Sequence, residues 1–319
     1  MEKMINTPLV SVVIPVYKVE DVIEHTIRSI IGQTYKNIEV ILVDDGTPDN
    51  SIIVAKRLLE KTSLNWKIVS QNNSGLPTAR NVGIQNASGD WVICPDSDDV
   101  LASQAIERML EVAIDNSVDC VFCGFKNVSD RNYDSLPEHE GGVSVLDVNK
   151  LRKLFINREL ILLVPGMLLR KSYYEAVKFD KDCPHDEDIH FMWQLFYLLD
   201  KVAYMDSDYY NYYVRSTSMS HSLKPENYLK TSQRYAEMTR RLSFKFPDDD
   251  IVPLIYPKYR LGGFHVLARS VDYKSFKDTV NKDGYRRDMN KLIFHGNIKL
   301  SLYALIFCIC LPLFYKISK

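Results

Sequence analysis

The sequence predicts an α/β protein whose first strands form a parallel sheet, and three observations support this class. Short apolar runs rich in β-branched residues lie at residues 9–16 (LVSVVIPV) and 38–43 (IEVILV). Each is followed by a stretch with apolar residues at helical spacing, and this alternation is typical of right-handed βαβ units. A later apolar run, residues 91–95 (WVICP), leads directly into a group of carboxylates, as expected at the carboxyl edge of an open sheet.

The first 70 residues supply the alternation in order. After the first strand, a helix is expected to end at Gly32; its apolar positions are Val22, Ile23, Ile27, Ile30 and Ile31. Residues 38–43 are the second expected strand, 51–61 the second helix and 66–70 a third short strand. Because the first run is continuously apolar, we expect that strand to be buried on both faces of the sheet.

Acidic residues follow two of the expected strands. Asp44 and Asp45 come directly after the second strand, and Asp96, Asp98 and Asp99 follow the run at 91–95. An unpaired carboxylate is too costly to bury in a core, so both groups belong at strand ends. In a parallel sheet these ends meet at one edge, and we therefore expect the two groups to converge.

The spacing of Asp96 and Asp98 indicates a metal site. On an extended backbone, side chains two positions apart point the same way. Two neighbouring carboxylates favour a cation between them, and hard oxygen ligands suit Mg²⁺ or Mn²⁺. The alternative is a solvated acidic turn that caps a helix beginning near Ser103.

A loop and a helix start lie between the acidic groups, at residues 72–83 (NNSGLPTARNVG). We expect the helix to begin at about Pro77, because proline is tolerated in a first turn. Arg80 and Asn81 then lie near the positive end of the helix, where anions bind favourably. Arg80 is a candidate phosphate partner or a clamp that holds Asp96; the alternative is a surface arginine on a capped helix.

Taken together, these segments resemble the family 2 glycosyltransferases. Five stretches occur in the family's order: VSVVIPVYK, SIIGQTY, EVILVDDGTPDNS, NSGLPTARNVGI and GDWVICPDSDDVL. The resemblance covers residues 8–125 closely and returns weakly over 185–220; one departure is Pro48, which stiffens the turn after Asp45. It implies the GT-A fold, a Rossmann-like nucleotide-diphospho-sugar transferase fold with a mostly parallel sheet flanked by helices, here with a helical C-terminal extension. It also implies metal-dependent, inverting transfer from a nucleotide-sugar.

The resemblance assigns roles to individual positions. The residues that match nucleotide-binding positions are Pro15, Tyr17, Asp44, Asp45, Arg80 and Asp96. Asp45, helped by Asp44, is expected to accept a hydrogen bond from the base. Asp96 is expected to contact the ribose or the metal, and Asp98 to bind the Mn²⁺ or Mg²⁺ that bridges the diphosphate. Such a cation neutralises charge that grows on the departing nucleoside diphosphate.

A second acidic cluster, HDED at residues 185–188, opens an expected helix, IHFMWQLFYLL. It resembles the family's Glu-Asp motif, which implies that Asp188 is the general base for the acceptor hydroxyl, with Glu187 as the alternative. A purely structural interpretation is also open, because acidic residues are favoured in a first helical turn. His185 and His190 are five positions apart, a poor helical spacing for joint metal ligation.

Two further features bear on the reaction. The family's processive members carry Gln-x-x-Arg-Trp after the base, whereas Gln194 is followed by LFY, which predicts transfer of a single sugar. A tyrosine-rich strand then leads to a segment that resembles the family's mobile lid over the diphosphate; its candidate residues are Arg215, Ser218, Ser220 and His221. The tyrosines at 209, 210, 212 and 213 are either core packing or a sugar platform, and core packing is favoured.

The C-terminal run at residues 300–315 (LSLYALIFCICLPLFY) is almost wholly apolar and is flanked by lysines. Sixteen helical residues span roughly 24 Å, short of the ~30 Å of a hydrocarbon core, and Pro312 argues against a clean span. We expect a helix that lies on the cytoplasmic face of the cell membrane, with lysines at anionic headgroups. The alternative is a tail docked on the protein's own core.

Composition excludes some classes. The formal net charge of −1 over 319 residues argues against a nucleic-acid binder. The six cysteines are too scattered for a disulfide framework, and the pair Cys120 and Cys123 is expected to be buried thiols rather than a zinc site. No secretory signal is evident. Residues 247–250 (PDDD) are expected to be a solvated turn and helix cap.

The predicted organisation follows from these segments. We expect a nucleotide-sugar-binding GT-A half over 1–125, an acceptor-binding and base half of the same domain over 126–225, a helical extension over 226–295 and an apolar membrane-associating tail over 296–319. The donor implied is a UDP-hexose or UDP-N-acetylhexosamine, and the acceptor a saccharide linked to a polyprenyl diphosphate in bacterial capsule, exopolysaccharide or O-antigen synthesis. Two alternatives stay open: a haloacid-dehalogenase-like phosphatase that uses Asp96, and a non-catalytic sugar-nucleotide-binding component.

Overall fold

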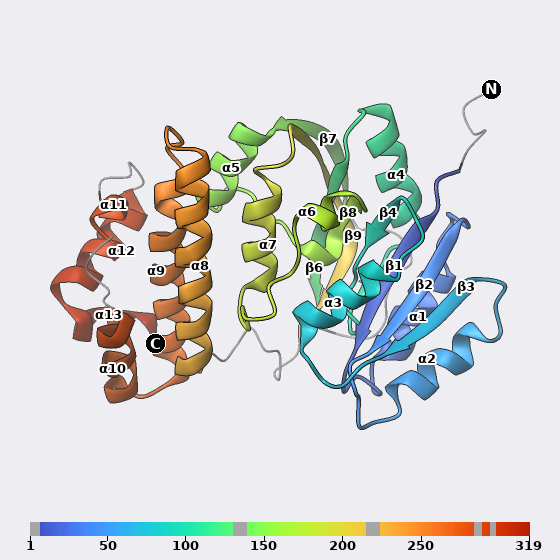
Figure 1. Ribbon diagram of the computed structural model, residues 1–319, viewed down its shortest axis with the longest axis horizontal. Helices are drawn as coiled ribbons and strands as arrows, with labels where there is room; N and C mark the ends of the chain where they lie inside the picture. Colours follow the sequence, from blue (N-terminus) through green and yellow to red (C-terminus); the bar gives the residue numbers. More distant parts are fainter. Residues whose placement is uncertain (1–6, 130–138, 215–223, 284–288, 294–297) are drawn as a thin grey trace. The chain divides into compact units, whose positions relative to one another are not determined.

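The computed structural model describes residues 7–129, 139–214, 224–283, 289–293 and 298–319. The chain divides into two compact units. The first comprises residues 1–151, 161–181 and 191–214 and contains the sheet; the second comprises 152–160, 182–190 and 215–319 and is mainly helical (Figure 1).

The first unit is an α/β sheet, which confirms the predicted fold class. Within the described residues the strand order is β3-β2-β1-β4-β8-β6-β9-β5, and β7 pairs with β9. β1 to β4 pair in parallel, whereas β8 runs antiparallel to both β4 and β6. The strands are β1 (Val10–Val16), β2 (Ile38–Asp44), β3 (Asn65–Ser70), β4 (Trp91–Ile93), β5 (Val100–Leu101), β6 (Cys120–Val128), β7 (Glu140–Asp147), β8 (Met167–Arg170) and β9 (Lys201–Tyr213).

Helices flank this sheet and make up most of the second unit. Those of the first unit are α1 (Ile23–Ile31), α2 (Ser51–Leu59), α3 (Leu76–Gln85), α4 (Ala105–Asp115), the 3₁₀ turn η1 (Val164–Gly166) and α6 (Tyr173–Ala176). α5 (Val148–Ile156) and α7 (Glu187–Leu195) contribute residues to both units. The second unit continues with α8 (Pro225–Lys245), α9 (Val252–Ser270), α10 (Tyr273–Asp283), α11 (Asn290–Ile293), α12 (Ile298–Ile309) and α13 (Leu311–Ser318).

Strand β1 is buried along its whole length because helices cover both faces of the sheet. Val12 and Ile14 belong to the core that includes Ile27 of α1. On the opposite face, a Cβ added to Gly83 of α3 would lie only 2.2 Å from Cγ1 of Val13. Glycine at this position therefore lets α3 lie close to β1, and the helices sandwich the strand (Figure 1).

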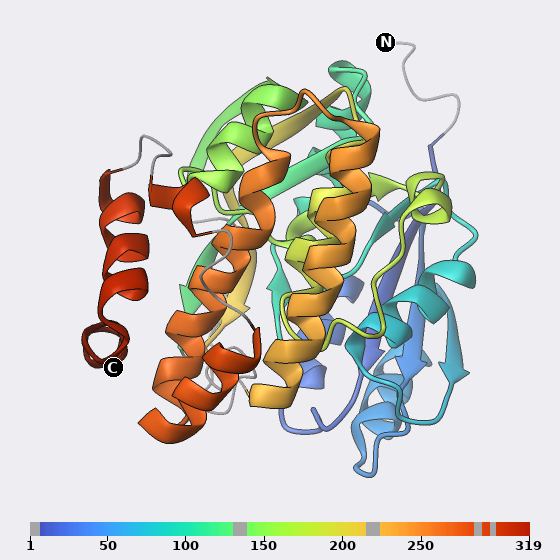
Figure 2. The same cartoon turned by 60° about the vertical axis from the view of Figure 1, so that its left-hand side comes forward.

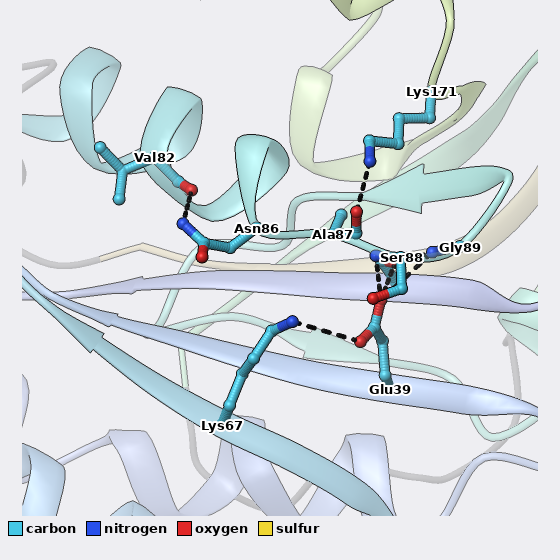
Figure 3. Close-up of polar contacts among 9 residues, drawn as sticks. Glu39, Lys67, Val82, Asn86, Ala87, Ser88, Gly89 and Lys171 are labelled. Atoms are coloured by element: carbon cyan, nitrogen blue, oxygen red, sulfur yellow. Dashed lines mark hydrogen bonds and ion pairs between the residues drawn. The ribbon is translucent and has the colours of Figure 1, made fainter.

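A buried carboxylate holds together the amino ends of the strands. Glu39 of β2 accepts a hydrogen bond of 2.6 Å from the Ser11 hydroxyl, one of 3.2 Å from the Gly89 N–H and one from the Ser88 N–H. The ammonium of Lys67 lies 3.7 Å from its second oxygen (Figure 3). Burial alone would raise the pKa of Glu39, but these partners hold it below its ordinary value.

The second unit is organised around α8 and α9, which run side by side (Figure 2). Aromatic rings join them: Tyr235 and Tyr259 stack with centroids 3.9 Å apart. The turn before α9 is a helix cap as predicted, because Asp249 accepts hydrogen bonds from the N–H groups of Ile251 and Val252. It is not fully solvated, however, since the Asp249 carboxylate is largely buried in an ion pair with Arg152.

One helix prediction is wrong. The single tail helix expected over 300–315 is instead two helices that break at Cys310 and pack on each other, with the rings of Phe307 and Phe314 4.7 Å apart. Across the described ranges, no helix is both long enough and apolar enough to cross a bilayer.

Candidate functional site at the carboxyl edge of the sheet

The two acidic groups lie at the same edge of the sheet, as predicted. β1 pairs in parallel with β2 on one side and with β4 on the other. Asp44 is opposite Val16 at the end of β1, and the second group follows Ile93 at the end of β4. Two strand spacings put β2 and β4 about 10 Å apart, so the groups flank the end of β1.

The second group is a turn, which corrects the predicted extended backbone. β4 ends at Ile93, and the N–H of Asp99 donates to the carbonyl of Asp96 across 3.2 Å. The alternation of a strand therefore does not set the directions of Asp96 and Asp98. Both are half-buried, whereas Asp99 is buried, so the turn itself brings three carboxylates together.

Arg80 holds Asp96, as in the clamp interpretation of the sequence. The guanidinium is buried, and its Nη2 lies 2.7 Å from Oδ1 of Asp96. It also lies over the ring of Phe179, 5.3 Å from the centroid. The side-chain amide of Asn81 donates to the carbonyl of Phe179 at 2.7 Å and accepts from the Phe179 N–H at 3.0 Å. The contact between Asn81 and Phe179 was not predicted, because the two residues lie almost a hundred positions apart in the sequence.

Asp99 is the innermost carboxylate of the turn. Its oxygens accept hydrogen bonds from the hydroxyl of Tyr210 and, at 2.7 Å, from the N–H of Tyr213. Burial and the nearby charges of Asp96 and Asp98 raise the pKa of Asp99 to about 8, despite these hydrogen bonds. Tyr210 is fully buried, so core packing was the correct interpretation of its ring; its hydroxyl contact was not predicted.

Asp45 organises the loop that precedes α3. One carboxylate oxygen accepts from the Gln71 side chain at 2.7 Å and from the Ser74 N–H at 2.8 Å, and the other accepts from the Gly75 N–H at 3.0 Å. A carboxylate has about four acceptor positions. Asp45 therefore keeps about one for an additional donor.

The end of β1 lies between the acidic groups. Pro15 is buried, and the ring of Tyr17 is 39% exposed, with the Lys18 ammonium 5.2 Å from its centroid. The Lys18 N–H donates to the Thr47 hydroxyl at 2.8 Å, which ties this segment to the turn after β2. The carboxylate of Asp44 supports the same turn by accepting from the Thr47 N–H at 3.0 Å. An exposed aromatic ring is thus held beside the acidic edge.

The acidic turn has the donor set of a hard divalent cation. No group of three side chains from His, Cys, Asp and Glu could hold a metal by itself in the described part of the chain. Mg²⁺, however, is commonly bound by one or two carboxylates, with water and substrate phosphate completing the shell. The charges of Asp96 and Asp98 help to raise the pKa of Asp99, and a bound cation would counter their repulsion. Asp96 and Asp98 therefore fit such an ion.

The candidate base residues lie in the second unit. Glu187 and Asp188 are in the first turn of α7, both half-buried. The preceding residue, Asp186, has φ +53°, and its carbonyl accepts from the His190 N–H at 2.9 Å and from the Tyr235 hydroxyl at 3.2 Å. The geometry fixes the start of the helix and leaves the choice between Glu187 and Asp188 open.

The two histidines of this segment have different surroundings. His190 is buried with its ring against Tyr235, at a centroid distance of 5.1 Å. His185 lies beside Asp186; burial lowers its pKa, but the carboxylates of Asp186, Glu187 and Asp188 outweigh this and raise it. The predicted lid residues Arg215, Ser218, Ser220 and His221 lie outside the described residues.

The cysteines follow the prediction of free thiols. Cys120 and Cys123 are both buried and unbridged on β6, and burial raises the pKa of Cys123 to about 12. Such thiols are poorly reactive.

Comparisons with known proteins agree on one family. The profile described as Glycosyl transferase family 2 matches residues 11–177. The uncharacterized glycosyltransferase EpsJ of Bacillus subtilis is 34% identical over 218 residues, which is 67% of this chain and 63% of that protein. The chain thus spans less than two thirds of the length of that relative.

Solved structures show the same fold at low identity. S. aureus TarS 1–349, in complex with UDP-GlcNAc, has a TM-score of 0.69 at 16% identity and covers 93% of this chain and 89% of its own. The mannosyltransferase PcManGT from Pyrobaculum calidifontis, in complex with GDP-Man and Mn²⁺, has a TM-score of 0.57 at 15% identity, with 97% and 89% covered.

Proposed function

The chain belongs to glycosyltransferase family 2, and from this premise we propose that it is an inverting enzyme that transfers one sugar from a nucleotide-sugar to a hydroxyl of a saccharide acceptor. The observation that carries the proposal is the pair of acidic groups on either side of the end of β1. The two strands that precede these groups lie about 10 Å apart, which suits a ligand with a base at one end and a diphosphate at the other.

The donor is proposed to lie across the end of β1. Tyr17 and Pro15 line the base pocket, and Asp45 offers its remaining acceptor position to a base N–H, with Asp44 beside it. Asp96, positioned by Arg80, contacts the ribose or shares the metal with Asp98. When bound, Mn²⁺ or Mg²⁺ neutralises the charge that develops on the leaving diphosphate.

The acceptor hydroxyl is proposed to lose its proton to Asp188, with Glu187 as the alternative. Inversion by direct displacement needs one carboxylate that removes this proton as the oxygen attacks the anomeric carbon. Both candidates are half-buried at a helix start, where the helix dipole favours the ionised form.

The proposed donor is a UDP-hexose or UDP-N-acetylhexosamine, and the proposed acceptor a saccharide linked to a polyprenyl diphosphate in bacterial surface-polysaccharide synthesis. UDP-GlcNAc bound to TarS supports the donor class. For a lipid-linked acceptor, attachment to the inner face of the cell membrane is proposed. The support is a row of exposed apolar residues along α12 and α13: Leu302, Leu305, Ile309, Leu313 and Ile317.

The two alternatives have less support. A haloacid-dehalogenase-like nucleophile follows the first strand of its domain, whereas Asp96 follows β4. Membership of the transferase family disfavours this phosphatase. A non-catalytic sugar-nucleotide binder predicts nucleotide binding without transfer or hydrolysis of any donor.

The test is a screen of radiolabelled UDP- and GDP-sugars against undecaprenyl-diphosphate-linked acceptors, with Mn²⁺ or with EDTA. We expect transfer that requires the metal and is lost in Asp98→Asn. The matched control is Asp278→Asn, which removes an exposed carboxylate of α10 and leaves transfer unchanged. Binding of UDP with unchanged affinity in EDTA would contradict the proposed metal bridge.

A further inference from the structure

One face of α9 carries a line of basic residues. Lys258, His265 and Arg269 are separated by seven and four positions, with Gly262 between the first two, and such positions share a helix face. Lys258 and His265 are half-buried, and Arg269 is exposed. All belong to the second unit.

Arg158 adds a fourth cation from the turn after α5. A Cβ placed on Gly262 would meet its Nη2 at 3.2 Å, so the guanidinium lies over the glycine. Arg158 has φ +57° and lies just after the last turn of α5. Its N–H and that of Glu159 donate to the carbonyls of Phe155 and Leu154, which is an ordinary left-handed helix end. The close approach of the guanidinium to Gly262 places this basic group on the face of α9 that carries the others.

The basic groups disfavour protonation of one another. Burial and the charge of Arg158 lower the pKa of Lys258 to about 8, although Glu159 opposes this. Burial and the charges of Arg269 and Arg158 lower the pKa of His265. A bound anion would reverse these shifts, and planar guanidinium groups are well suited to phosphate oxygens.

The cationic face adjoins the apolar C-terminal helices. The hydroxyl of Tyr303 on α12 lies 2.7 Å from Nδ1 of His265, and Nε of Arg269 donates to the carbonyl of Ser318 on α13 at 2.7 Å. The same two helices expose Leu302 and Ile317. Positive charge beside exposed apolar surface favours an amphiphilic anion over a purely polar one.

We propose that Arg158, Lys258, His265 and Arg269 form a binding site for a phosphate group, supplied by the headgroup of an anionic lipid whose acyl region contacts α12 and α13. The class of ligand is a phosphate monoester or diphosphate, which carries more negative charge than a phosphodiester. The site deepens the proposed membrane attachment, but it does not depend on the donor or the metal.

The test uses sedimentation of the full chain with phosphatidylcholine vesicles that contain or lack phosphatidic acid, at fixed ionic strength. We expect binding to the phosphatidic acid vesicles and about a tenfold weaker affinity for the double variant Arg158→Gln/Lys258→Gln. The matched control, Lys274→Gln/Lys277→Gln, removes two exposed charges from α10 in the same unit. An equal loss in both variants means diffuse electrostatic attraction and overturns the site.

A second measurement keeps every charge. Gly262→Ala brings a methyl group against the Arg158 guanidinium and should weaken vesicle binding several-fold without lowering Tm, because alanine favours the helix. Pyrophosphate should also move the imidazole titration of His265 to higher pH. If pyrophosphate shifts the His265 titration but the protein does not bind vesicles, the site binds phosphate from a soluble ligand and the lipid part of the proposal is wrong. If pyrophosphate has no effect and the vesicles do not bind, the whole proposal is wrong. Neither assay contains a nucleotide-sugar or a metal. A failure of the phosphate site would therefore not contradict the proposed glycosyl transfer.

Discussion

The two ends of the sheet each bury a carboxylate, and the two carboxylates behave in opposite ways. Glu39, at the amino ends of β1 and β2, is surrounded by donors, and its pKa is lowered (Figure 3). Asp99, at the carboxyl edge beyond β4, is crowded by Asp96 and Asp98, and burial with these charges raises its pKa to about 8. At one end the partners of the carboxylate are donors and a cation, whereas at the other they include two further carboxylates.

The surroundings of the two carboxylates differ in charge. Both groups are almost inaccessible to solvent, so burial alone does not distinguish them. What distinguishes them is the sign of the neighbouring charges, because donors and cations stabilise an ionised carboxylate and other carboxylates destabilise it. A pKa that burial and specific neighbouring charges shift strongly marks a candidate functional site, and this agrees with the proposed cation at the carboxyl edge.

The largest effect is expected at the carboxyl edge. Asp98→Asn should reduce transfer about 10²–10³-fold, because the proposed metal site would lose a charged ligand that is worth several kcal/mol in the transition state. Its Tm should stay near that of wild type, since the Asp98 side chain is only half-buried. Steady-state kinetics at saturating Mn²⁺ together with thermal unfolding measure both. A large fall in Tm with unchanged activity would mean that Asp98 stabilises the fold and does not take part in transfer.

Glu39→Gln should have the opposite signature, a loss of stability. The amide cannot accept in the same way from all its partners, and we expect unfolding to become easier by about 2–3 kcal/mol at pH 7. Because the folded pKa of Glu39 is lowered, its stabilisation is present above the ordinary carboxyl pKa of 4.5 and is lost as pH falls through the lower folded value. Urea titrations from pH 7 to pH 3 should show the difference from wild type shrinking only in acid.

Asp99→Asn should stabilise the metal-free protein. The folded pKa of about 8 lies above the ordinary 3.8, so ionisation opposes folding increasingly as pH rises from about 4 to about 8. An amide removes this penalty, and we expect Tm to rise by about 3 °C at pH 9 and to respond less to Mn²⁺. Scanning calorimetry at pH 5 and pH 9 is the measurement. A lower Tm at pH 9 would mean that the hydrogen bonds to Tyr210 and Tyr213 outweigh the repulsion.

Features that depend on residues close together in the sequence were predicted, whereas features that depend on distant residues were not. The strands, the helix start near Pro77 and the convergence of Asp44 with Asp96 depend on local periodicity and on the parallel arrangement, and these predictions are confirmed. An acidic turn at residues 96–99 was only the alternative to an extended backbone, because the apolar run at 91–95 resembles a longer strand than β4 proves to be.

The partners of the site residues were beyond prediction. Glu39 contacts Gly89 fifty positions away, and Asp99 contacts Tyr210 more than a hundred positions away. Nothing in the strand IEVILV distinguishes its glutamate from a solvent-facing one. The break of the tail at Cys310 likewise depends on the packing of Phe307 against Phe314. Pro312 indicated that the helix is interrupted, but it did not indicate where.

The smallest effect is expected from a substitution of Lys67. It measures how much of the stabilisation by Glu39 comes from the ion pair and how much from the hydrogen bonds. The ammonium lies 3.7 Å from the carboxylate, and its side chain is 41% exposed, so water screens the pair and the expected cost of Lys67→Gln is below about 0.5 kcal/mol. The hydrogen bonds from Ser11, Ser88 and Gly89 are shielded from water, so they should account for most of the loss in Glu39→Gln. Urea unfolding of both single variants and the double variant, in low and high salt, measures the share of the ion pair. If Lys67→Gln cost as much as Glu39→Gln, the amino end would also depend on a counter-ion, and the contrast between the two ends of the sheet would be lost.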